Sequence, residues 1–398
     1  MMMKTAGLPF LNGQKRLGVL GAGQLGKMMA VPAANWKMPL WGLDKDTSYP
    51  AAPYFTRFVS GDFSREADVL AFGRQVDLLT IEIEHVHTGA LHQLEAEGLR
   101  IHPAPTVLDI IKDKGAQKEF YARHNLPTAP FQLLDGEAEV VAAIQSGGLS
   151  FPFVQKSRRD GYDGKGVAVI RTEADMAKLL PGPCVIETMA DISKELAVIV
   201  ARNENGEEKA YPVVEMTFHP EANLVDMLLA PARIDADTAA RATELALRTA
   251  RAFGVCGLLA VELFLNADGG IWVNEVAPRP HNSGHHTIES CVTSQFEQHL
   301  RAVLNLPLGD TRLIQPAVML NILGAEGQEG PAVYEGVAEA MALPGVHLHL
   351  YGKTDTKPFR KMGHITVTGS TLEQAMAIAA RVEVRAVASA YSSPSQDL

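Results

Sequence analysis

The sequence predicts a protein of mixed α/β and α+β class that is built from three domains. Its first hundred residues alternate apolar strand candidates with helical stretches, whereas the later part gathers strands into runs and ends in a small β-rich segment. A length of 398 residues also exceeds what one hydrophobic core usually serves. We expect domains at residues 1–110, 111–310 and 311–398, with a lid subdomain at about 129–205 inside the second.

The first domain is predicted to be doubly wound, because its strands and helices alternate. A strand at residues 16–20 leads through a glycine-rich turn into a helix that runs to Ala34. A helix at 64–75 separates strands at 40–43 and 76–82. Residues 1–16 lack a long apolar stretch, so we expect a loose leader and no secretory signal.

The second domain is expected to follow an extended linker at residues 125–130, where Pro127 and Pro130 disfavour helix in the residues before them. Apolar runs then predict strands at 153–156, 167–171, 185–187, 195–202 and 209–214. A helix at 235–253 precedes a hairpin with strands 258–265 and 271–276 and a turn at 266–270. The tail is expected to hold strands at 347–351 and 364–368 and a helix at 371–381.

Composition excludes several functional classes. The net charge of −10 opposes binding to nucleic acid or to an anionic membrane surface, since both require a basic field. The longest apolar run, residues 255–265, is too short to span a bilayer. Cys184, Cys256 and Cys291 stand far apart and lack Cys-x-x-Cys spacing, so no disulfide framework is expected and a cytoplasmic location fits best.

The turn Gly21-Ala22-Gly23-Gln24-Leu25-Gly26 matches G-x-G-x-x-G between a strand and a helix. Asp44 stands near the end of the second strand, about where the ribose-binding acid of a dinucleotide site would lie. This pattern alone would indicate an NAD-dependent dehydrogenase. However, free amides at a helix N-terminus can bind the phosphate of another ligand equally well, so the motif leaves both interpretations open.

Two carboxylates in the predicted hairpin form the strongest functional signal. Glu262 lies within an apolar strand, where an unpaired charge is costly, and antiparallel pairing would bring Glu275 onto the same face. A divalent cation relieves the repulsion between them, and Glu262, Glu275 and Asn274 offer the oxygen ligands that Mg²⁺ prefers, with ATP phosphates and waters completing the shell. The alternative is that one glutamate pairs with an arginine and the other faces water.

A dense polar loop follows the hairpin. It contains Arg279, His281, Asn282, Ser283, His285 and His286, a mixture of anion-binding and proton-handling groups that is typical of a functional loop. A zinc site formed by the three histidines is a weaker alternative, because no cysteine accompanies them and the adjacent acids favour a hard cation.

A second glycine-rich loop follows the strand that ends at Lys156. Its glycines permit close backbone approach to phosphate and its basic residues neutralise charge, so it is predicted to act as a lid. An exposed hairpin with surface charges is the alternative. Glu187 and Glu195 stand where they could accept hydrogen bonds from adenine or ribose, although exposed strand-end acids would look the same. Taken alone, Lys114 would be an ordinary solvated lysine.

Together these features resemble the ATP-grasp superfamily and, within it, the N5-carboxyaminoimidazole ribonucleotide synthetase family. The resemblance runs from about residue 16 to residue 385. It rests on the first glycine turn, the lid Gly161-Tyr162-Asp163-Gly164-Lys165-Gly166, the stretch from Asn274 to His285, and the late Pro358-Phe359-Arg360-Lys361-Met362-Gly363-His364. The Arg279-x-His281-Asn282-Ser283-Gly284-His285 segment is the specific part, whereas the first glycine turn is not.

The resemblance implies an ATP-grasp fold with a Rossmann-like N-terminal domain and a small C-terminal domain. For ATP it implies Lys114, Lys156, Gly161, Tyr162, Asp163, Gly164, Lys165, Gly166, Glu187, Glu195, His219, Asn274 and Glu275. It implies Glu262 and Glu275 for Mg²⁺, and it places Arg279, His281, Asn282, Tyr162 and Asp163 near the carboxylation centre. It implies Gln24, Leu25, Glu82, Tyr162, Lys353, Arg360 and Lys361 for the ribonucleotide.

The implied reaction is the ATP- and bicarbonate-dependent carboxylation of aminoimidazole ribonucleotide through carboxyphosphate, catalysed by a homodimer. Asp163 and His281 are both candidates for accepting the amine proton. Three departures from the family pattern concern the nucleophile's contacts: the strand that reads Thr80-Ile81-Glu82-Ile83-Glu84-His85, His286 in place of a common tryptophan, and Phe359 in place of glycine.

Three competing functions remain open at this stage. A formate-dependent glycinamide ribonucleotide transformylase would share the fold and the magnesium pair. An NAD-dependent dehydrogenase would use the first domain. A nucleotide-sensing module without turnover is disfavoured, because both glutamates and the lid lysine are present.

Overall fold

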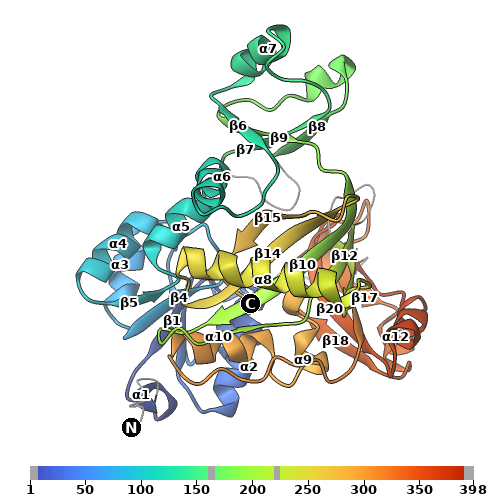
Figure 1. The fold of residues 1–398 in the computed structure, drawn as a ribbon. Helices are drawn as coiled ribbons and strands as arrows, with labels where there is room; N and C mark the ends of the chain where they lie inside the picture. The colour runs from blue at the N-terminus through green and yellow to red at the C-terminus, as the bar shows by residue number, and fades with distance from the viewer. Residues whose placement is uncertain (1–7, 160–165, 219–224, 390–398) are drawn as a thin grey trace.

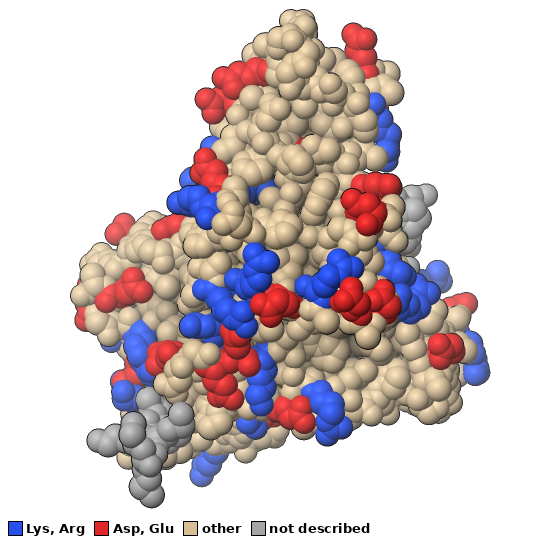
Figure 2. Space-filling model, in the orientation of Figure 1, with Lys and Arg blue, Asp and Glu red and all other residues tan. Residues whose placement is uncertain are grey.

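The computed structural model describes residues 8–159, 166–218 and 225–389. It has a broad body of sheets and helices with a narrow lobe projecting from it, which is the green segment at the top of Figure 1. Among the described helices, none combines the length and apolar character needed to cross a membrane. Lys, Arg, Asp and Glu are interspersed across the middle of the face in Figure 2, so this face carries no patch of a single sign.

The first sheet is parallel, with strand order β3-β2-β1-β4-β5. Its strands are β1 (Leu17–Leu20), β2 (Leu40–Asp44), β3 (Arg57–Ser60), β4 (Leu78–Ile81) and β5 (Arg100–His102). The helices between and after them are α2 (Gln24–Asn35), α3 (Glu66–Gly73), α4 (Thr88–Ala96) and α5 (Pro105–Ile111). This order confirms the predicted doubly wound arrangement. The sequence order of the strands reverses between β1 and β4, and ligands of such sheets usually bind at this switch point.

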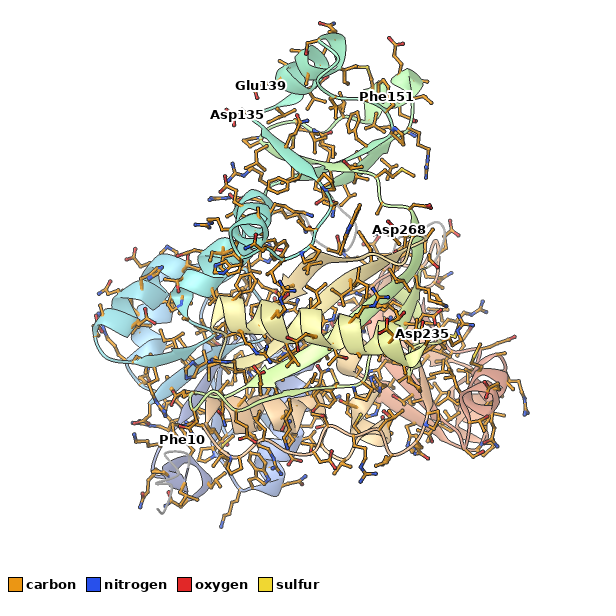
Figure 3. All side chains as sticks on the ribbon, viewed as in Figure 1. Phe10, Asp135, Glu139, Phe151, Asp235 and Asp268 are labelled. Carbon is orange, nitrogen blue, oxygen red and sulfur yellow. The ribbon has the colours of Figure 1, made fainter. Side chains whose placement is uncertain are left out.

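The first residues described were predicted wrongly. Instead of a loose leader, Leu8–Leu11 form a short helix, α1, and Phe10 is fully buried against the first domain. Figure 3 labels Phe10 at the foot of the molecule. Burial of the aromatic ring removes apolar surface from water, and this stabilises the helix against the loss of chain entropy. The cations of Lys15 and Arg100 lie over the ring at 6.0 and 5.8 Å.

The projecting lobe is a four-stranded antiparallel sheet of order β6-β9-β7-β8. Its elements are β6 (Phe131–Leu134), α7 (Glu137–Gln145), β7 (Phe153–Ser157), β8 (Val167–Ile170), η2 (Glu173–Lys178) and β9 (Cys184–Thr188). A small apolar core fills it, including Val140, Phe153 and Ile186. The helix α6 (Lys114–Arg123) leads from the first domain to this lobe.

The largest sheet has the order β15-β14-β10-β12-β13-β16-β20-β18, with β11 paired to β10. Its strands are β10 (Ile192–Arg202), β11 (Glu208–Ala210), β12 (Val214–Phe218), β13 (Val225–Ala230), β14 (Gly257–Asn266), β15 (Ile271–Ala277), β16 (Ala317–Leu323), β18 (Val346–Leu350) and β20 (Lys361–Thr368). The amphipathic helix α8 (Ala236–Phe253) lies across it (Figure 1), capped by the side chain of Asp235, which Figure 3 labels.

Further short helices and strands lie after the hairpin of β14 and β15. They are η3 (Asn282–Gly284), α9 (Thr287–Ser290), α10 (Gln295–Val303), β17 (Gly330–Glu335), α11 (Val337–Met341), β19 (Asp355–Thr356), α12 (Leu372–Ala379) and β21 (Arg385–Ala388). Because β13 pairs with β16, one sheet continues from the predicted second domain into the predicted third. The strand predicted at 209–214 is wrong, since residues 211–213 separate β11 from β12.

Candidate functional site

The hairpin of β14 and β15 brings the two predicted metal ligands together. Glu262 lies directly opposite Glu275, and the register shifts after that pair, so Asn274 is the extra residue of a β-bulge. Strict alternation would point Asn274 and Glu275 to opposite faces, whereas a bulge re-aims side chains. Ala197 of β10 pairs with Glu262, so Glu195, two residues away on that strand, lies on the same face. Three carboxylates therefore share one side of the sheet.

Electrostatics distinguish these carboxylates. Burial, with Glu275 and Glu195 close by, raises the pKa of Glu262. The ammonium group of Lys114 lowers the pKa of Glu275, which carries the negative charge of the pair. Burial also raises the pKa of Glu195 to about 7. A cation between Glu262 and Glu275 would relieve this repulsion.

Lysines surround the acidic face. Lys114, at the start of α6, contacts the carboxylate of Glu275. Lys156 Nζ lies 2.9 Å from Asn274 Oδ1 and 3.0 Å from Glu187 Oε2. Glu187 pairs across the lobe sheet with Val154, two residues from Lys156, so both side chains leave the same face. The base of the lobe thus directs a cation toward the hairpin.

The base of the lobe is also tied to α6. Asp113 caps this helix by accepting hydrogen bonds from the amides of Gly115 and Ala116, and its carboxylate pairs with Arg158 at 2.8 Å. The Lys114 amide donates to the carbonyl of Arg158 at 2.8 Å. Gly166, at the far end of the lid loop, accepts from Ser157 and has φ +76°. The predicted residues Gly161, Tyr162, Asp163, Gly164, Lys165 and His219 lie outside the described residues.

The polar loop after the hairpin connects three parts of the molecule. Arg279 Nε lies 2.8 Å from Glu84 Oε1 of the first domain. His281 Nε2 lies 3.5 Å from Glu262, and Asn282 exchanges side-chain hydrogen bonds with Asn321 of β16. The loop therefore meets the hairpin, the first domain and the C-terminal part at one place.

The three histidines of this loop do not converge. His285 Nδ1 pairs with Gln295 at 3.0 Å, and His286 Nδ1 pairs with Ser290 at 2.7 Å, with both rings buried. Burial lowers the pKa of His286 to about 3 and that of His285 well below its usual value. In the part of the chain that the structure describes, no three His, Cys, Asp or Glu side chains are grouped as metal ligands. The two hairpin glutamates would therefore need outside ligands, such as nucleotide phosphates, to complete a shell.

At the switch point of the first sheet, Glu82 occupies the glycine turn. Its carboxylate accepts hydrogen bonds from the amides of Gly23 and Gly26, around the first residues of α2, Gln24 and Leu25. Burial raises the pKa of Glu82 to about 7. The amides that a dinucleotide would use are therefore already taken by a carboxylate, which disfavours the dehydrogenase interpretation.

Asp44, the candidate ribose ligand of that interpretation, has a structural role. It is buried, and its carboxylate accepts hydrogen bonds from the amides of Ala22 and Lys45 at 2.8 Å each. Burial raises its pKa. Asp44 therefore stabilises the glycine turn through its hydrogen bond with Ala22.

The predicted phosphate ligands of the C-terminal part lie on neighbouring segments. Lys353 Nζ donates to the carbonyl of Lys361 at 2.6 Å, and Arg360 donates to the carbonyl of Asp355 at 2.7 Å. The charge of Lys361 lowers the pKa of Glu262, so this lysine lies near the hairpin. Phe359 has φ +61°, a left-handed conformation that glycine adopts without strain.

Sequence reasoning missed three residues of this region: Lys118, Glu84 and Asn321. Lys118 follows Lys114 by one helical turn and Glu84 follows Glu82 by two residues, so periodicity could have placed each beside a recognised residue. Asn321 had no such signal, because its contact with Asn282 depends on how the C-terminal part packs.

Comparisons with known proteins match the whole arrangement. Three family models match in succession: a ribonucleotide synthetase preATP-grasp domain at residues 14–112, an ATP-grasp domain at 119–296, and a phosphoribosylaminoimidazole carboxylase C-terminal domain at 317–378. The N5-carboxyaminoimidazole ribonucleotide synthase of Bacillus subtilis is 37% identical over 88% of this chain and 90% of its own. The ATP-grasp fold predicted from the sequence is thereby confirmed.

Longer relatives and solved structures agree. The chloroplastic phosphoribosylaminoimidazole carboxylase of Vigna aconitifolia is 40% identical over 89% of this chain, which spans 64% of that relative. The synthetase structure from Thermotoga maritima has a TM-score of 0.87 and 41% identity, covering 94% of this chain and 100% of its own. The Aspergillus clavatus enzyme, solved with ADP and 5-aminoimidazole ribonucleotide, has a TM-score of 0.84 and 34% identity, covering 92% of this chain and 97% of its own.

Proposed function

Because this chain belongs to the N5-carboxyaminoimidazole ribonucleotide synthase family, we propose that it uses ATP and bicarbonate to carboxylate 5-aminoimidazole ribonucleotide in purine biosynthesis. The observation that carries the proposal is the opposition of Glu262 and Glu275 beside Lys114 and Lys156. This is the charge pattern that a triphosphate with its metal requires. The complex of the Aspergillus clavatus relative with ADP and 5-aminoimidazole ribonucleotide supports the same choice of ligands.

The proposed reaction has two steps. A bicarbonate oxygen attacks the γ-phosphorus of ATP, the bond to the bridging oxygen breaks, and ADP leaves carboxyphosphate behind. The carboxyl group then passes to the exocyclic amine, either from carboxyphosphate itself or from the CO₂ it releases, with loss of inorganic phosphate and one amine proton. Because carboxyphosphate is unstable in water, the site must exclude solvent between the two steps.

Mg²⁺ fits the hairpin, because Glu262 and Glu275 supply oxygen ligands. Burial and the nearby charge of Glu275 raise the pKa of Glu262, and a cation would offset both effects. When bound there, it would neutralise charge on the nucleotide phosphates. Lys114 and Lys156 would bind those phosphates, with Asn274 beside the metal. We assign Glu187 and Glu195 to the nucleoside, and the lid residues 161–166 and His219 to ATP as well.

Arg279 is proposed to stabilise the bicarbonate-derived anion, with Glu84 holding its guanidinium in place. His281 and Asn282 border the same point, and Asp163 or His281 would accept the amine proton. Gln24, Leu25, Glu82 and Tyr162 would hold the ribonucleotide, whose phosphate would bind Lys353, Arg360 and Lys361. Ionised Glu82 can accept hydrogen bonds from ribose hydroxyls while it remains bound to the turn amides.

The decisive experiment measures ADP release from ATP with aminoimidazole ribonucleotide, with and without added bicarbonate. We expect release that requires both compounds, and a carboxylated product identified by its incorporation of labelled bicarbonate. Glycinamide ribonucleotide with formate is the matched comparison. Turnover with that pair alone would favour the transformylase alternative, and absence of ADP release with either pair would contradict the proposed function.

We also propose a homodimer and a cytoplasmic location. Closed dimers are the commonest oligomers of globular enzymes. The cysteines Cys184, Cys256 and Cys291 are all unpaired and buried, as a reducing compartment permits. Light scattering at micromolar concentration tests the dimer, and cell fractionation tests the location.

A further inference from the structure

Lys118 is a buried lysine that none of the proposed ligand roles requires. It lies on α6 one turn after Lys114 and is 3% exposed. Lysine is almost never buried this fully unless a partner balances its charge. Its Nζ lies 2.9 Å from Glu187 Oε1 and donates a hydrogen bond of 2.6 Å to Thr128 Oγ1. A cation is therefore fixed inside the protein, close to the nucleotide site.

Glu187 lies between two lysines. Its other oxygen, Oε2, lies 3.0 Å from Lys156 Nζ, and its side chain is 4% exposed. One buried carboxylate needs one cation, so Lys118 alone can balance Glu187. Lys156 also donates to Asn274 at the bulge of the proposed metal hairpin. It is therefore the lysine of the two that can leave Glu187 for a ligand.

Thr128, the second contact of Lys118, connects α6 to the hairpin. Thr128 lies in the linker, and its hydroxyl donates to the carbonyl of Val273 at 2.7 Å, immediately before Asn274 in the chain. Since the same hydroxyl accepts from Lys118, three segments are joined through one ammonium group: α6, the linker and β15.

We propose that Lys118 is a positioning residue that balances the charge of Glu187, so that Lys156 is free to bind the phosphates of the nucleotide. The proposal rests on the proposed function in taking a nucleotide as the ligand. Without Lys118, Lys156 is the only cation within ion-pair distance of Glu187 among the residues that the structure describes. Moving it to a phosphate then leaves Glu187 uncompensated, which strongly opposes binding.

The titration of Lys118 offers an independent readout. Burial, partly offset by Glu187 of β9, lowers its pKa to about 8, with Lys156 of β7 and Lys114 of its own helix contributing in the same direction as burial. Above this pH Lys118 loses its charge, and Glu187 then depends on Lys156. Nucleotide affinity should therefore fall as the pH rises through about 8.

The experiment measures binding of ATP and of AMP by calorimetry, without bicarbonate, to the full chain and to Lys118→Met. We expect ATP binding to weaken about 10- to 100-fold, the scale on which losing a hydrogen-bond partner of a metal ligand weakens a metal site. AMP binding should change less than about twofold, because AMP lacks the β- and γ-phosphates that would draw Lys156 away from Glu187. The KM for aminoimidazole ribonucleotide, measured in a separate turnover assay with bicarbonate, should also change less than about twofold. Lys178→Met is the matched control, since Lys178 is an exposed lysine of the projecting lobe with one ion pair.

Lys118→Arg separates charge from packing. Arginine keeps its proton across the range, so ATP affinity of this variant should stay level between pH 7 and pH 9.5, while that of the wild type falls. If Lys118→Met does not fold, Thr128→Val and the pH profile of the wild type decide, with Thr128→Val expected to weaken ATP binding and to spare AMP.

Several outcomes would overturn the proposal. One is unchanged ATP binding in Lys118→Met, and another is equal weakening of ATP and AMP, which would indicate a general structural role. A level pH profile in the wild type would also count against it. If instead the wild type binds no ATP, the proposed function fails first, so the two failures are distinguishable.

Discussion

Glu275 carries the charge of the hairpin pair, so we expect Glu275→Gln to abolish ADP formation. The amide keeps the volume of the side chain but removes the anion that Lys114 contacts and that a metal would need. The expected loss in kcat is at least about 100-fold, the scale of removing one group that stabilises developing charge. ADP release is the measurement, with circular dichroism to confirm the fold.

Glu95→Gln is the control for this change, because Glu95 is an exposed glutamate on α4. It should keep full turnover. ADP release at the wild-type rate by Glu275→Gln would refute the assignment of Glu275 as a metal ligand, whatever the fate of the other residues.

Glu82 predicts a pH dependence of stability. Its pKa rises from 4.5 to about 7 on folding, so the folded chain binds the proton more tightly than the unfolded chain. Its contribution to the free energy of unfolding therefore falls as the pH rises from about 4.5 to 7, by about 3 kcal/mol at most. Glu82→Gln removes this titration, so the difference in stability between variant and wild type should grow in favour of the variant across that window.

Thermal and denaturant unfolding at a series of pH values checks this expectation. Other buried acids, such as Glu195, titrate in both proteins and cancel in the difference. Parallel curves for the two proteins between pH 4.5 and 8 would show that Glu82 keeps an ordinary pKa in the folded chain.

At the scale of elements, local patterns predicted the hairpin and the long helix closely. The predicted strands at 258–265 and 271–276 correspond to β14 and β15, and the helix at 235–253 corresponds to α8. The sequence did not indicate the bulge at Asn274, because a bulge is a property of two strands in register and not of one strand. β3 was missed because it is short and partly exposed and carries no apolar run.

Gly284 of the polar loop packs closely against β10 and α10. A Cβ there would lie 2.3 Å from Ile199 Cδ1 and 2.5 Å from Gln295 Oε1, so these side chains or the loop itself would have to shift. Gly284→Ala should destabilise the fold by about 1–3 kcal/mol, as overpacking usually does. It should also lower kcat, because the displaced loop carries His281 and Asn282 next to the hairpin.

Thermal unfolding and ADP release measure these two effects. Gly148→Ala is the control, since its added Cβ would meet its nearest atom at an ordinary 3.6 Å. We expect that variant to change stability by less than about 0.5 kcal/mol. Unchanged unfolding and turnover in Gly284→Ala would mean that β10 and the loop separate without cost.

At the scale of the whole molecule, the class and the order of parts could be predicted, but the way they join could not. Strand and helix alternation predicted the first domain, because its five strands, β1 to β5, pair only with one another. The link between β13 and β16 brings together residues about 90 apart, and no periodicity in either strand identifies its partner. The domain boundary at residue 310 therefore stays a prediction from the sequence, and the largest sheet continues across it.

This continuity has a consequence for the chain cut at residue 310. In the fragment 1–310, β13 would become a sheet edge, and the buried Leu229 would lose its packing against Val318 and Ile365. Unpaired strand edges with exposed apolar side chains favour aggregation. We expect the isolated fragment to lack a cooperative unfolding transition and to aggregate in size-exclusion chromatography.

The full chain cleaved at residue 310 but not separated should unfold as the intact chain does, because both pieces still pair. A monomeric fragment that unfolds cooperatively would show instead that residues 1–310 fold without β16 and β20. The β13–β16 pairing would then contribute little to the stability of the fragment.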